Sequence, residues 1–245
     1  MMNNNKSKCN YCFQRIYAER IKRVLDFILS ISAIAFLFPL LVFLAIVGAL
    51  AMKGNPFFVQ PRPGKNERIF KLVKFRTMNN KKDSSGNLLP DEQRLTKYGK
   101  FLRKSSLDEL PELWNIAIGD MSIIGPRPQL VRDMVFMTPK QRQRHMVRPG
   151  LSGLAQVHGR NDIDWEEKLS WDLKYIQNIT FWGDVKIIIL TLWKAFVKQE
   201  GITEGDMATA EDFGDYLLGK GKITRDEYNK RQREARRLLI QGHEI

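Results

Sequence analysis

Cysteine is scarce in this 245-residue chain, which has only Cys9 and Cys12, spaced as one C-x-x-C. A structural zinc site needs four ligands, so this pair cannot close one within a single chain. The shortage of cysteine also excludes a disulfide scaffold and indicates chemistry that faces a reducing compartment. We interpret the pair as two thiols of an N-terminal tail, residues 1–19, while a redox or cross-chain role stays open.

Nucleotide-binding motifs are missing as well. The chain contains neither GxxxxGK[ST] nor GxGxxG, so an ATP-driven motor and a dinucleotide-binding enzyme lose their main support. Acidic residues are outnumbered, 27 against 40 lysines and arginines, which gives a formal net charge of +13. This excess indicates an anionic partner, which is nucleic acid, an anionic membrane surface or a phosphorylated substrate.

What the sequence does contain is one long apolar run, from Phe27 to Met52, without a charged residue. As a helix it reaches roughly 39 Å, which is enough to cross a bilayer. The run is too long for a signal peptide and has no small-residue cleavage site, so its removal by a signal peptidase is not expected. We predict that this segment lies in a membrane.

Two features indicate how the segment lies there. Basic residues stand at both ends, among them Arg23 before it and Lys53 after it, and such residues favour the cytoplasmic side. Pro39, near the midpoint, removes a backbone hydrogen bond and bends the helix. For residues 20–53 we therefore predict a re-entrant helix–break–helix that enters one leaflet and returns. A straight membrane-crossing helix with a tolerated proline is the alternative.

After the membrane segment, residues 54–205 are predicted to form one domain, at the cytoplasmic face to which the basic flanks point. The apolar runs of FFVQPRPGKNERIFKLVKFRTM are separated by a Pro-Gly-Lys-Asn turn and predict a β-hairpin. Alternation along the second run puts Leu72, Lys74 and Arg76 on one strand face, where two cations suit a diphosphate. A solvated strand face would have the same pattern.

Helices are predicted in the rest of the chain, which gives an α+β fold that is mainly helical. Residues 164–179 have an apolar stripe and a capping box. Residues 184–198 have a broad apolar face with lysines, which suits an amphipathic helix in the lipid headgroup layer, although a buried helix fits equally well. Residues 206–245 are predicted to form a C-terminal helical extension without a catalytic role.

The stretch SSLDELPELW contains an adjacent pair of carboxylates, Asp108 and Glu109. With Ser106 the pair fits a capping box, in which the acids lie at the positive end of a helix. The alternative is a catalytic pair, because a carboxylate near Arg103 and Arg127 is expected to have a depressed pKa, stay ionised and act as a nucleophile. Such a carboxylate can also bind Mg²⁺ together with diphosphate oxygens. Both interpretations stay open on the residues alone.

Two arginines next to prolines indicate phosphate binding. Arg127 lies within Gly-Pro-Arg-Pro and Arg148 within Arg-Pro-Gly, where the rigid backbone pre-sets each guanidinium for a two-pronged contact. The Asp-Ile-Asp at 162–164 matches a metal-binding D-x-D, but its second aspartate is better explained as a helix N-cap. His145 and His158 have no carboxylate at motif spacing, so structural or surface roles are predicted for both.

Several stretches, taken in order, resemble one known family. They are IKRVLDFILS, FFVQPRPGKNERIFKLVKFRTM, LRKSSLDELPELWNIAIGDMSIIGPRP, VRPGLSGLAQVHGRN and DWEEKLSWDLKYIQNITFWGDVKIIILTL. Together they cover about residues 20–200 and resemble the bacterial sugar transferases known as small monotopic phosphoglycosyl transferases. Two positions depart from the family pattern: Phe38 precedes Pro39 where the family often has serine, and His158 replaces an asparagine of the glycine-rich loop.

This resemblance implies a monotopic enzyme at the cytoplasmic face of the inner (plasma) membrane, with residues 54–205 as its catalytic domain, acting in the first membrane step of glycan synthesis. It implies that Asp108 attacks the β-phosphate of a UDP-sugar, releases UMP and carries the phosphosugar, which polyprenyl phosphate, usually undecaprenyl phosphate, then accepts. Mg²⁺ is the implied cofactor, with Asp108 touching the metal and Glu109 orienting or deprotonating the acceptor. The family's substrate-binding positions fall on Lys74, Arg103, Arg127 and Arg160 around phosphates and nucleotide, and on Asp184, which N-capping of its helix would also explain.

Two other classes of function fit parts of the sequence. The net charge of +13 would suit a membrane-tethered nucleic-acid-binding protein, but no nucleic-acid-binding module is recognisable, so we expect no nucleic-acid partner. A membrane scaffold without catalysis would leave Glu109 and Arg127 unimportant. The sequence identifies neither the donor sugar nor the oligomeric state, so a homo-oligomer stays open.

Overall fold

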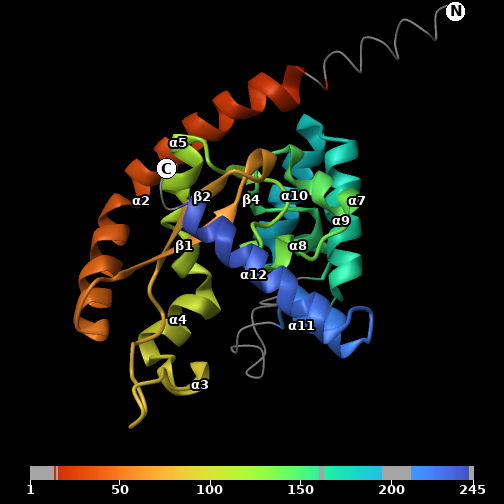
Figure 1. The fold of residues 1–245 in the computed structure, drawn as a ribbon. Coiled ribbons are helices and arrows are strands. Elements are labelled where there is room, and N and C mark those ends of the chain that lie inside the picture. The colour runs from red at the N-terminus through yellow and green to blue at the C-terminus, as the bar shows by residue number, and fades with distance from the viewer. Residues whose placement is uncertain (1–13, 15, 160–162, 195–210, 243–245) are drawn as a thin grey trace, which may run out of the picture.

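The computed structural model describes residues 14, 16–159, 163–194 and 211–242. It is mainly helical, with two small sheets of two strands each (Figure 1). This architecture confirms the predicted α+β class. Cys9, Cys12 and Arg160 lie outside the described residues, as does the first aspartate of the Asp-Ile-Asp motif.

The apolar run forms one continuous helix. A π-helical turn, η1 (Tyr17–Ile21), leads into α2 (Lys22–Met52). Pro39 lies inside α2 without ending it, so the predicted break between two helices is wrong. Figure 1 shows this helix, drawn red to orange, changing direction along its length, and proline is a common cause of such a bend.

This helix is apolar and mostly exposed, yet both of its halves contact the rest of the protein. Within the span Tyr17–Met52, the most apolar 18-residue stretch has a mean hydropathy of 2.8 and is 11% buried, and the span is long enough to cross a membrane. In the first half, the buried Asp26 accepts a hydrogen bond from Ser122 Oγ at 2.7 Å. In the second half, Tyr98 Oη donates to the carbonyl of the buried Leu44 at 2.7 Å. The helix therefore lies along the domain instead of projecting from it.

The predicted β-hairpin is confirmed. Its elements are β1 (Phe57–Pro63), the 3₁₀ turn η2 (Lys65–Glu67) and β2 (Ile69–Phe75), with the two strands antiparallel. Leu72 and Lys74 line the same cavity, as their alternation predicts, whereas Arg76 lies just past the end of β2.

One side chain of α5 (Glu112–Ile118) fixes this hairpin. The amide of the buried Asn115 accepts a hydrogen bond from Val73 N at 3.1 Å and donates to the Lys71 carbonyl at 2.8 Å. Because both partners are backbone groups of β2, the strand is held in register with α5 as well as with β1.

Shorter elements complete the middle of the chain. A second sheet forms where β3 (Ser122–Ile124) pairs in parallel with β4 (Gly150–Ser152). The other elements before residue 160 are α3 (Asp91–Arg94), α4 (Lys97–Ser105), η3 (Leu107–Glu109), α6 (Val131–Met134), α7 (Pro139–Arg142), η4 (Gln143–Met146) and α8 (Leu154–His158).

Two longer helices follow, α9 (Trp165–Gln177) and α10 (Phe181–Trp193). The first confirms the predicted helix, and Asp164 is its N-cap, accepting a backbone N–H at 2.8 Å. The second begins earlier than residue 184, where it was predicted to begin, because Thr180 caps it through the N–H of Gly183.

The C-terminal extension packs into the core. Its helices are α11 (Phe213–Gly219) and α12 (Arg225–Gly242), and α12 crosses the front of the molecule in Figure 1, drawn blue. Phe213 is buried, and its ring lies 5.1 Å from that of Trp165. The two rings belong to one hydrophobic cluster with Val131 and Met134 of α6, so the extension and the domain share one core.

Candidate active site

Asp108 and Glu109 lie on the 3₁₀ turn η3, which directly follows α4. Ser106 is in the left-handed region (φ 56°), and its side chain makes no capping hydrogen bond to η3. The capping-box interpretation of this pair is therefore wrong. The turn instead presents the two adjacent carboxylates to side chains from β2 and from the loop after β3.

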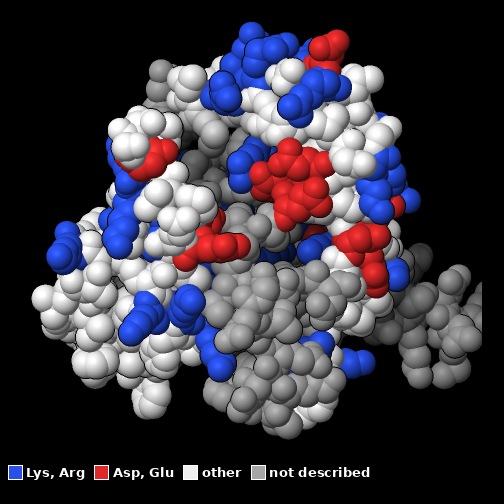
Figure 2. Space-filling view, turned by 90° about the horizontal axis from the view of Figure 1, so that it is seen from below, with Lys and Arg blue, Asp and Glu red and all other residues white. Residues whose placement is uncertain are grey.

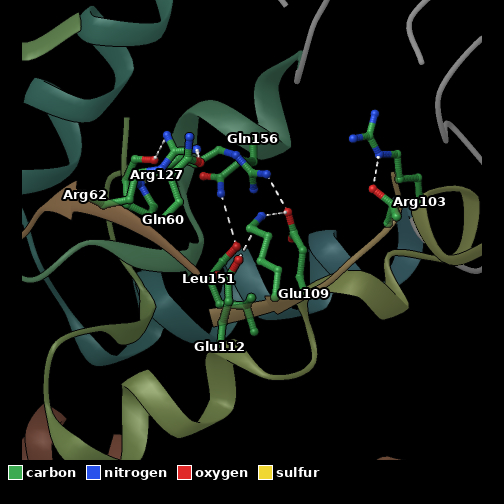
Figure 3. A network of polar contacts seen from close by, with 11 residues as sticks. Gln60, Arg62, Arg103, Glu109, Glu112, Arg127, Leu151 and Gln156 are labelled. Carbon is green, nitrogen blue, oxygen red and sulfur yellow. Dashed lines mark hydrogen bonds and ion pairs between the residues drawn. The ribbon is translucent and has the colours of Figure 1, made fainter. Parts of the chain in front are cut away.

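Glu109 is the centre of an ion-pair network (Figure 3). Its Oε1 accepts hydrogen bonds from Lys74 Nζ at 2.9 Å and from the Arg127 guanidinium at 2.5 Å. Burial alone would raise the pKa of Glu109, but the cations Arg127 and Lys74 outweigh it and hold this pKa well below its usual range. Glu109 is therefore ionised at neutral pH and is a very weak base.

Asp108 is in a different electrostatic situation. Burial, and next the negative charge of Glu109, raise its pKa to about 6, against the opposing effect of Lys74, Arg103 and Arg127. The sequence-based expectation of a depressed pKa is therefore wrong. At pH 7 a pKa of about 6 still leaves roughly ten ionised carboxylates for each protonated one, so Asp108 keeps the charge that a nucleophile needs.

Glu112 is a third carboxylate of this network, and sequence reasoning missed it. It is 2% exposed, and its Oε1 lies 2.9 Å from Lys74 Nζ. Burial raises the pKa of Glu112 although Lys74 opposes the shift. The signal was present in the sequence as a further acid one helical turn after Asp108, at the start of α5.

A buried ion pair, formed by Arg144 and Asp172, holds the backbone of Arg127 in place. Arg144 donates to the Arg127 carbonyl at 2.6 Å and to Asp172 Oδ2 at 2.7 and 2.9 Å. The side chains of Arg144 and Asp172 are 1% and 3% exposed. Neither residue was predicted, because nothing in the sequence relates η4 to the middle of α9.

The loop that carries Arg127 also packs too closely for larger residues. A Cβ on Gly125 would lie 2.6 Å from the Arg148 carbonyl, and one on Gly150 would lie 2.0 Å from the Gly125 nitrogen. The glycines therefore allow the two proline-containing loops to touch through their backbones, which fixes Arg127 over η3.

Beside this network is a cavity of about 320 Å³. Arg62 lies in its wall, where burial, and next the charge of Arg127, lower the pKa of the guanidinium to about 10. The part of the cavity at Arg62, Lys74 and Arg127 therefore suits phosphate groups. The lining includes Arg62, Leu72, Lys74, Glu112, Arg127, Gln156, Lys168, Asp172, Glu211 and Asp212.

Comparison with known proteins gives the family of the chain. Residues 17–198 match the family model described as bacterial sugar transferase. The chain belongs to the bacterial sugar transferase family. This membership confirms the family that the sequence motifs indicate.

Related proteins are found in several bacteria. The chain is 45% identical over 204 residues to the uncharacterized sugar transferase EpsL of Bacillus subtilis, covering 83% of this chain and 98% of that protein. It is 37% identical over 188 residues to the UDP-glucose:undecaprenyl-phosphate glucose-1-phosphate transferase of Klebsiella pneumoniae, covering 73% of this chain and 40% of that protein. An N-acetylgalactosaminephosphotransferase of Aeromonas hydrophila, which by its name acts on UDP-N-acetylgalactosamine and undecaprenyl phosphate, is 38% identical over 180 residues, covering 70% of this chain and 43% of that protein. The chain thus spans about two fifths of these longer relatives.

Two other predicted site residues of the sugar transferase, Arg103 and Arg148, make hydrogen bonds outside the Glu109 network. Arg103 donates to Thr77 Oγ1 at 3.1 Å and stands apart from the Glu109 network in Figure 3, although its charge acts on Asp108. Arg148 donates to the Gly119 carbonyl at 2.8 Å and does not line the cavity. Its predicted contact with substrate stays a prediction.

Asp184 belongs to a separate cluster. Its carboxylate accepts hydrogen bonds from Tyr17 Oη and Tyr175 Oη, both at 2.8 Å, and from Lys22 Nζ at 2.6 Å. Thr180 caps α10, so N-capping does not explain this aspartate. Its observed contacts join the start of the apolar helix to α9 and α10 and leave substrate binding at Asp184 a prediction.

The residues present fit a magnesium ion that arrives with its substrate. Among the residues that the structure describes, no three His, Cys, Asp or Glu side chains gather as a ready-made metal site. Mg²⁺ needs no such cage, because it is commonly held by one or two carboxylates together with substrate phosphates and water. Asp108 and Glu109 offer carboxylates of this kind close to Lys74 and Arg127, which line the cavity.

Proposed function

We propose that this sugar transferase moves a sugar phosphate from a UDP-sugar to undecaprenyl phosphate, with release of UMP. The observation that carries the proposal is the ionised pair Asp108 and Glu109, set among Lys74, Arg103 and Arg127 beside the cavity. Relatives named as UDP-sugar:undecaprenyl-phosphate sugar-phosphate transferases support the same reaction. The product is the lipid-diphosphate-linked sugar that a membrane glycan pathway extends.

In the first step, an oxygen of Asp108 attacks the β-phosphorus of the donor. The bond from that phosphorus to the bridging oxygen breaks, and UMP leaves with the electron pair. Asp108 then carries the phosphosugar as a mixed anhydride. Lys74 and Arg127 lie where they can stabilise the negative charge that develops on the transferring phosphoryl group.

In the second step, a phosphate oxygen of undecaprenyl phosphate attacks the same phosphorus and frees the Asp108 carboxylate. This acceptor is already an anion, so the step needs no strong base. Glu109 is ionised and fully engaged with Lys74 and Arg127. We therefore assign it the orientation of these two cations, not the deprotonation of the acceptor.

Magnesium belongs to the proposal as the cofactor, with Asp108 as its protein ligand. When bound, Mg²⁺ would neutralise charge on the diphosphate and so make the phosphorus easier for an anion to approach. Arg62 and Arg127 contribute further positive charge from the protein side.

We also propose that the enzyme is monotopic, at the cytoplasmic face of the inner membrane. Both halves of α2 contact the same domain, through Asp26 and Leu44, while Phe36 between them is 84% exposed. On α10, Trp182 and Ile189 are 76% and 60% exposed, which suits a helix at headgroup level. An anionic lipid substrate would meet a basic active site at that height.

The decisive experiment separates donor cleavage from lipid transfer. Purified enzyme given a UDP-sugar and Mg²⁺, without lipid, should release about one UMP per active site, and the peptide containing Asp108 should gain the mass of the sugar phosphate. The Asp108→Asn variant should release none, while the matched Asp226→Asn, at an exposed aspartate of α12, should behave like wild type. Release of UMP by Asp108→Asn at the wild-type rate would remove the proposed nucleophile.

A further inference from the structure

Three buried polar atoms without a hydrogen-bond partner belong to residues that line the active-site cavity. In the described part of the chain, such atoms are Arg62 Nε, Gln156 Oε1, Asp172 Oδ1 and the remote His145 Nδ1. Buried polar atoms in proteins are nearly always paired. Their concentration around one cavity therefore indicates that a ligand supplies the missing partners.

The three atoms need different ligand groups, because one is a hydrogen-bond donor and two are acceptors. Arg62 Nε is a donor and, with Lys74 and Arg127, suits the oxygens of a phosphate. The oxygens of Gln156 and Asp172 are acceptors, and the carboxylates of Glu211 and Asp212 line the same cavity. We call Gln156, Asp172, Glu211 and Asp212 the acceptor set.

A phosphate is the wrong ligand for the acceptor set, because three of its four members are carboxylates that repel anions. A hydroxyl group is the right one, because it can donate a hydrogen bond to an amide or carboxylate oxygen. A sugar presents several hydroxyls together. One molecule with a diphosphate and a sugar would therefore satisfy both kinds of lining.

The carboxylates of Glu211 and Asp212 come from the C-terminal extension, beyond residue 198, where the family match ends. Asp212 Oδ2 lies 2.7 Å from the Arg132 guanidinium, and the Glu211 carbonyl accepts from Trp165 Nε1 at 3.0 Å. The next residue, Phe213, donates its N–H to Asp133 Oδ1 at 3.0 Å. These bonds fix the extension as a wall of the cavity. Figure 2 shows acidic side chains gathered next to basic ones on the face seen from below.

We infer that the acceptor set binds hydroxyl groups of the transferred sugar and that Asp212, supplied by the C-terminal extension, discriminates between donor sugars. The inference rests on the proposed function, since it takes the UDP-sugar as the donor. Sugars that differ at one carbon point one hydroxyl in different directions. A carboxylate held in place by Arg132 therefore separates them, because only one of the isomers brings a hydroxyl within its reach.

The test measures donor binding without turnover. In an Asp108→Asn background, dissociation constants are measured by calorimetry for UDP-glucose, UDP-galactose, UDP-N-acetylglucosamine, UDP-N-acetylgalactosamine and UMP. Adding Asp212→Asn should weaken the tightest-binding donor about tenfold or more, leave UMP unchanged and reduce the preference among the four donors. The matched control is Asp215→Asn in the same extension, whose carboxylate accepts from Tyr228 Oη at 2.8 Å and does not line the cavity.

The outcomes separate the competing explanations. An equal loss of UMP affinity would show that the acceptor set reads the ribose and would overturn the inference, as would unchanged donor affinities. If Asp212→Asn lowers the melting temperature, Gln156→Ala repeats the test at a residue outside the extension, with the same expected loss of donor preference. A wild-type enzyme that binds donors selectively but never releases UMP would refute the proposed reaction and leave this inference standing.

Discussion

At the scale of single residues, the molecule keeps several charged groups out of water by pairing them across long stretches of sequence. Arg144 and Asp172 form such a pair, and His145 lies next to it, 5% exposed. Burial, and next the positive charge of Arg144, lower the pKa of His145 to about 3. Its neighbours Arg142 and Glu67 form an ion pair with each other, and Glu67 Oε1 is 3.8 Å from His145 Nδ1. The histidine is therefore a neutral structural residue, as predicted.

The low pKa of His145 makes folding stability depend on pH in a defined window. In the unfolded chain the imidazole titrates near its ordinary pKa of about 6.5, so between about 6.5 and 3 the unfolded state binds more protons. The contribution of His145 to stability is complete above that window and should fall by up to about 1.4 kcal/mol per pH unit as pH decreases through it. Denaturant unfolding of the wild type and of His145→Phe, from pH 7 to 4.5, measures this slope.

The variant His145→Phe should have the shallower slope, because it removes the titrating group. The matched control is His158→Phe, at an exposed histidine of α8, which should keep the wild-type slope. Equal slopes in all three proteins would show that His145 takes up a proton as easily in the folded state as in the unfolded one.

The sequence predicts the carboxylates that we propose to be catalytic but not the residues that support them. Asp108, Glu109, Lys74 and Arg127 carry recognisable local motifs, and the structure brings them together. Arg144 has no such motif, because its role depends on a partner in another helix and on complete burial. The predicted direction of the Asp108 pKa shift was wrong because the sequence shows the nearby arginines but not the burial of the carboxylate, which raises its pKa.

At the scale of elements, α5 and the hairpin form the frame of the candidate active site. Asn115 bonds the N–H of Val73 and the carbonyl of Lys71, on either side of Leu72 and close to Lys74. The amide therefore fixes the strand that carries Lys74. The hairpin itself was predictable from its turn and apolar runs. The contact of Asn115 with β2, which we call the clasp, was not predictable, because an asparagine within a helix gives no sign of its hydrogen-bond partner.

Replacing Asn115 with alanine should destabilise the fold strongly. The change leaves two backbone groups without partners, which should lower the free energy of unfolding by about 2–5 kcal/mol. Thermal or denaturant unfolding in detergent gives this value. The control is Asn79→Ala, because the Asn79 amide makes a solvent-exposed bond to the Lys81 N–H, and its loss should change stability by less than about 0.5 kcal/mol. Similar stabilities for both variants would contradict the role of the clasp.

At the scale of the whole molecule, the main question is how α2 lies in the bilayer. The sequence predicts an apolar segment with basic flanks, and the structure adds that both halves of this segment contact one domain. The place of the C-terminal extension in the cavity wall was not predictable, because it depends on tertiary packing around Phe213 and Trp165.

The two native cysteines report the topology directly, since Cys9 and Cys12 precede α2 and the chain has no others. A membrane-impermeant maleimide should leave them unlabelled in intact spheroplasts and label them after lysis, because a monotopic chain keeps both flanks of α2 in the cytoplasm. The reference is Ser84→Cys in a Cys9→Ser, Cys12→Ser background, at an exposed site of the domain. Labelling of the native cysteines, but not of this reference, in intact spheroplasts would instead establish a membrane-crossing helix.

The cluster around Asp184 has a consequence for the proposed reaction with a lipid phosphate. It joins Tyr17 and Lys22, at the start of the anchor, to Tyr175 of α9, while Tyr98 holds the other end of the anchor to α4. An anchor braced at both ends cannot swing like a tether. The height of Asp108 above the hydrocarbon of the membrane is then set by the protein itself, so in the proposed reaction the phosphate of the lipid has to move to that height.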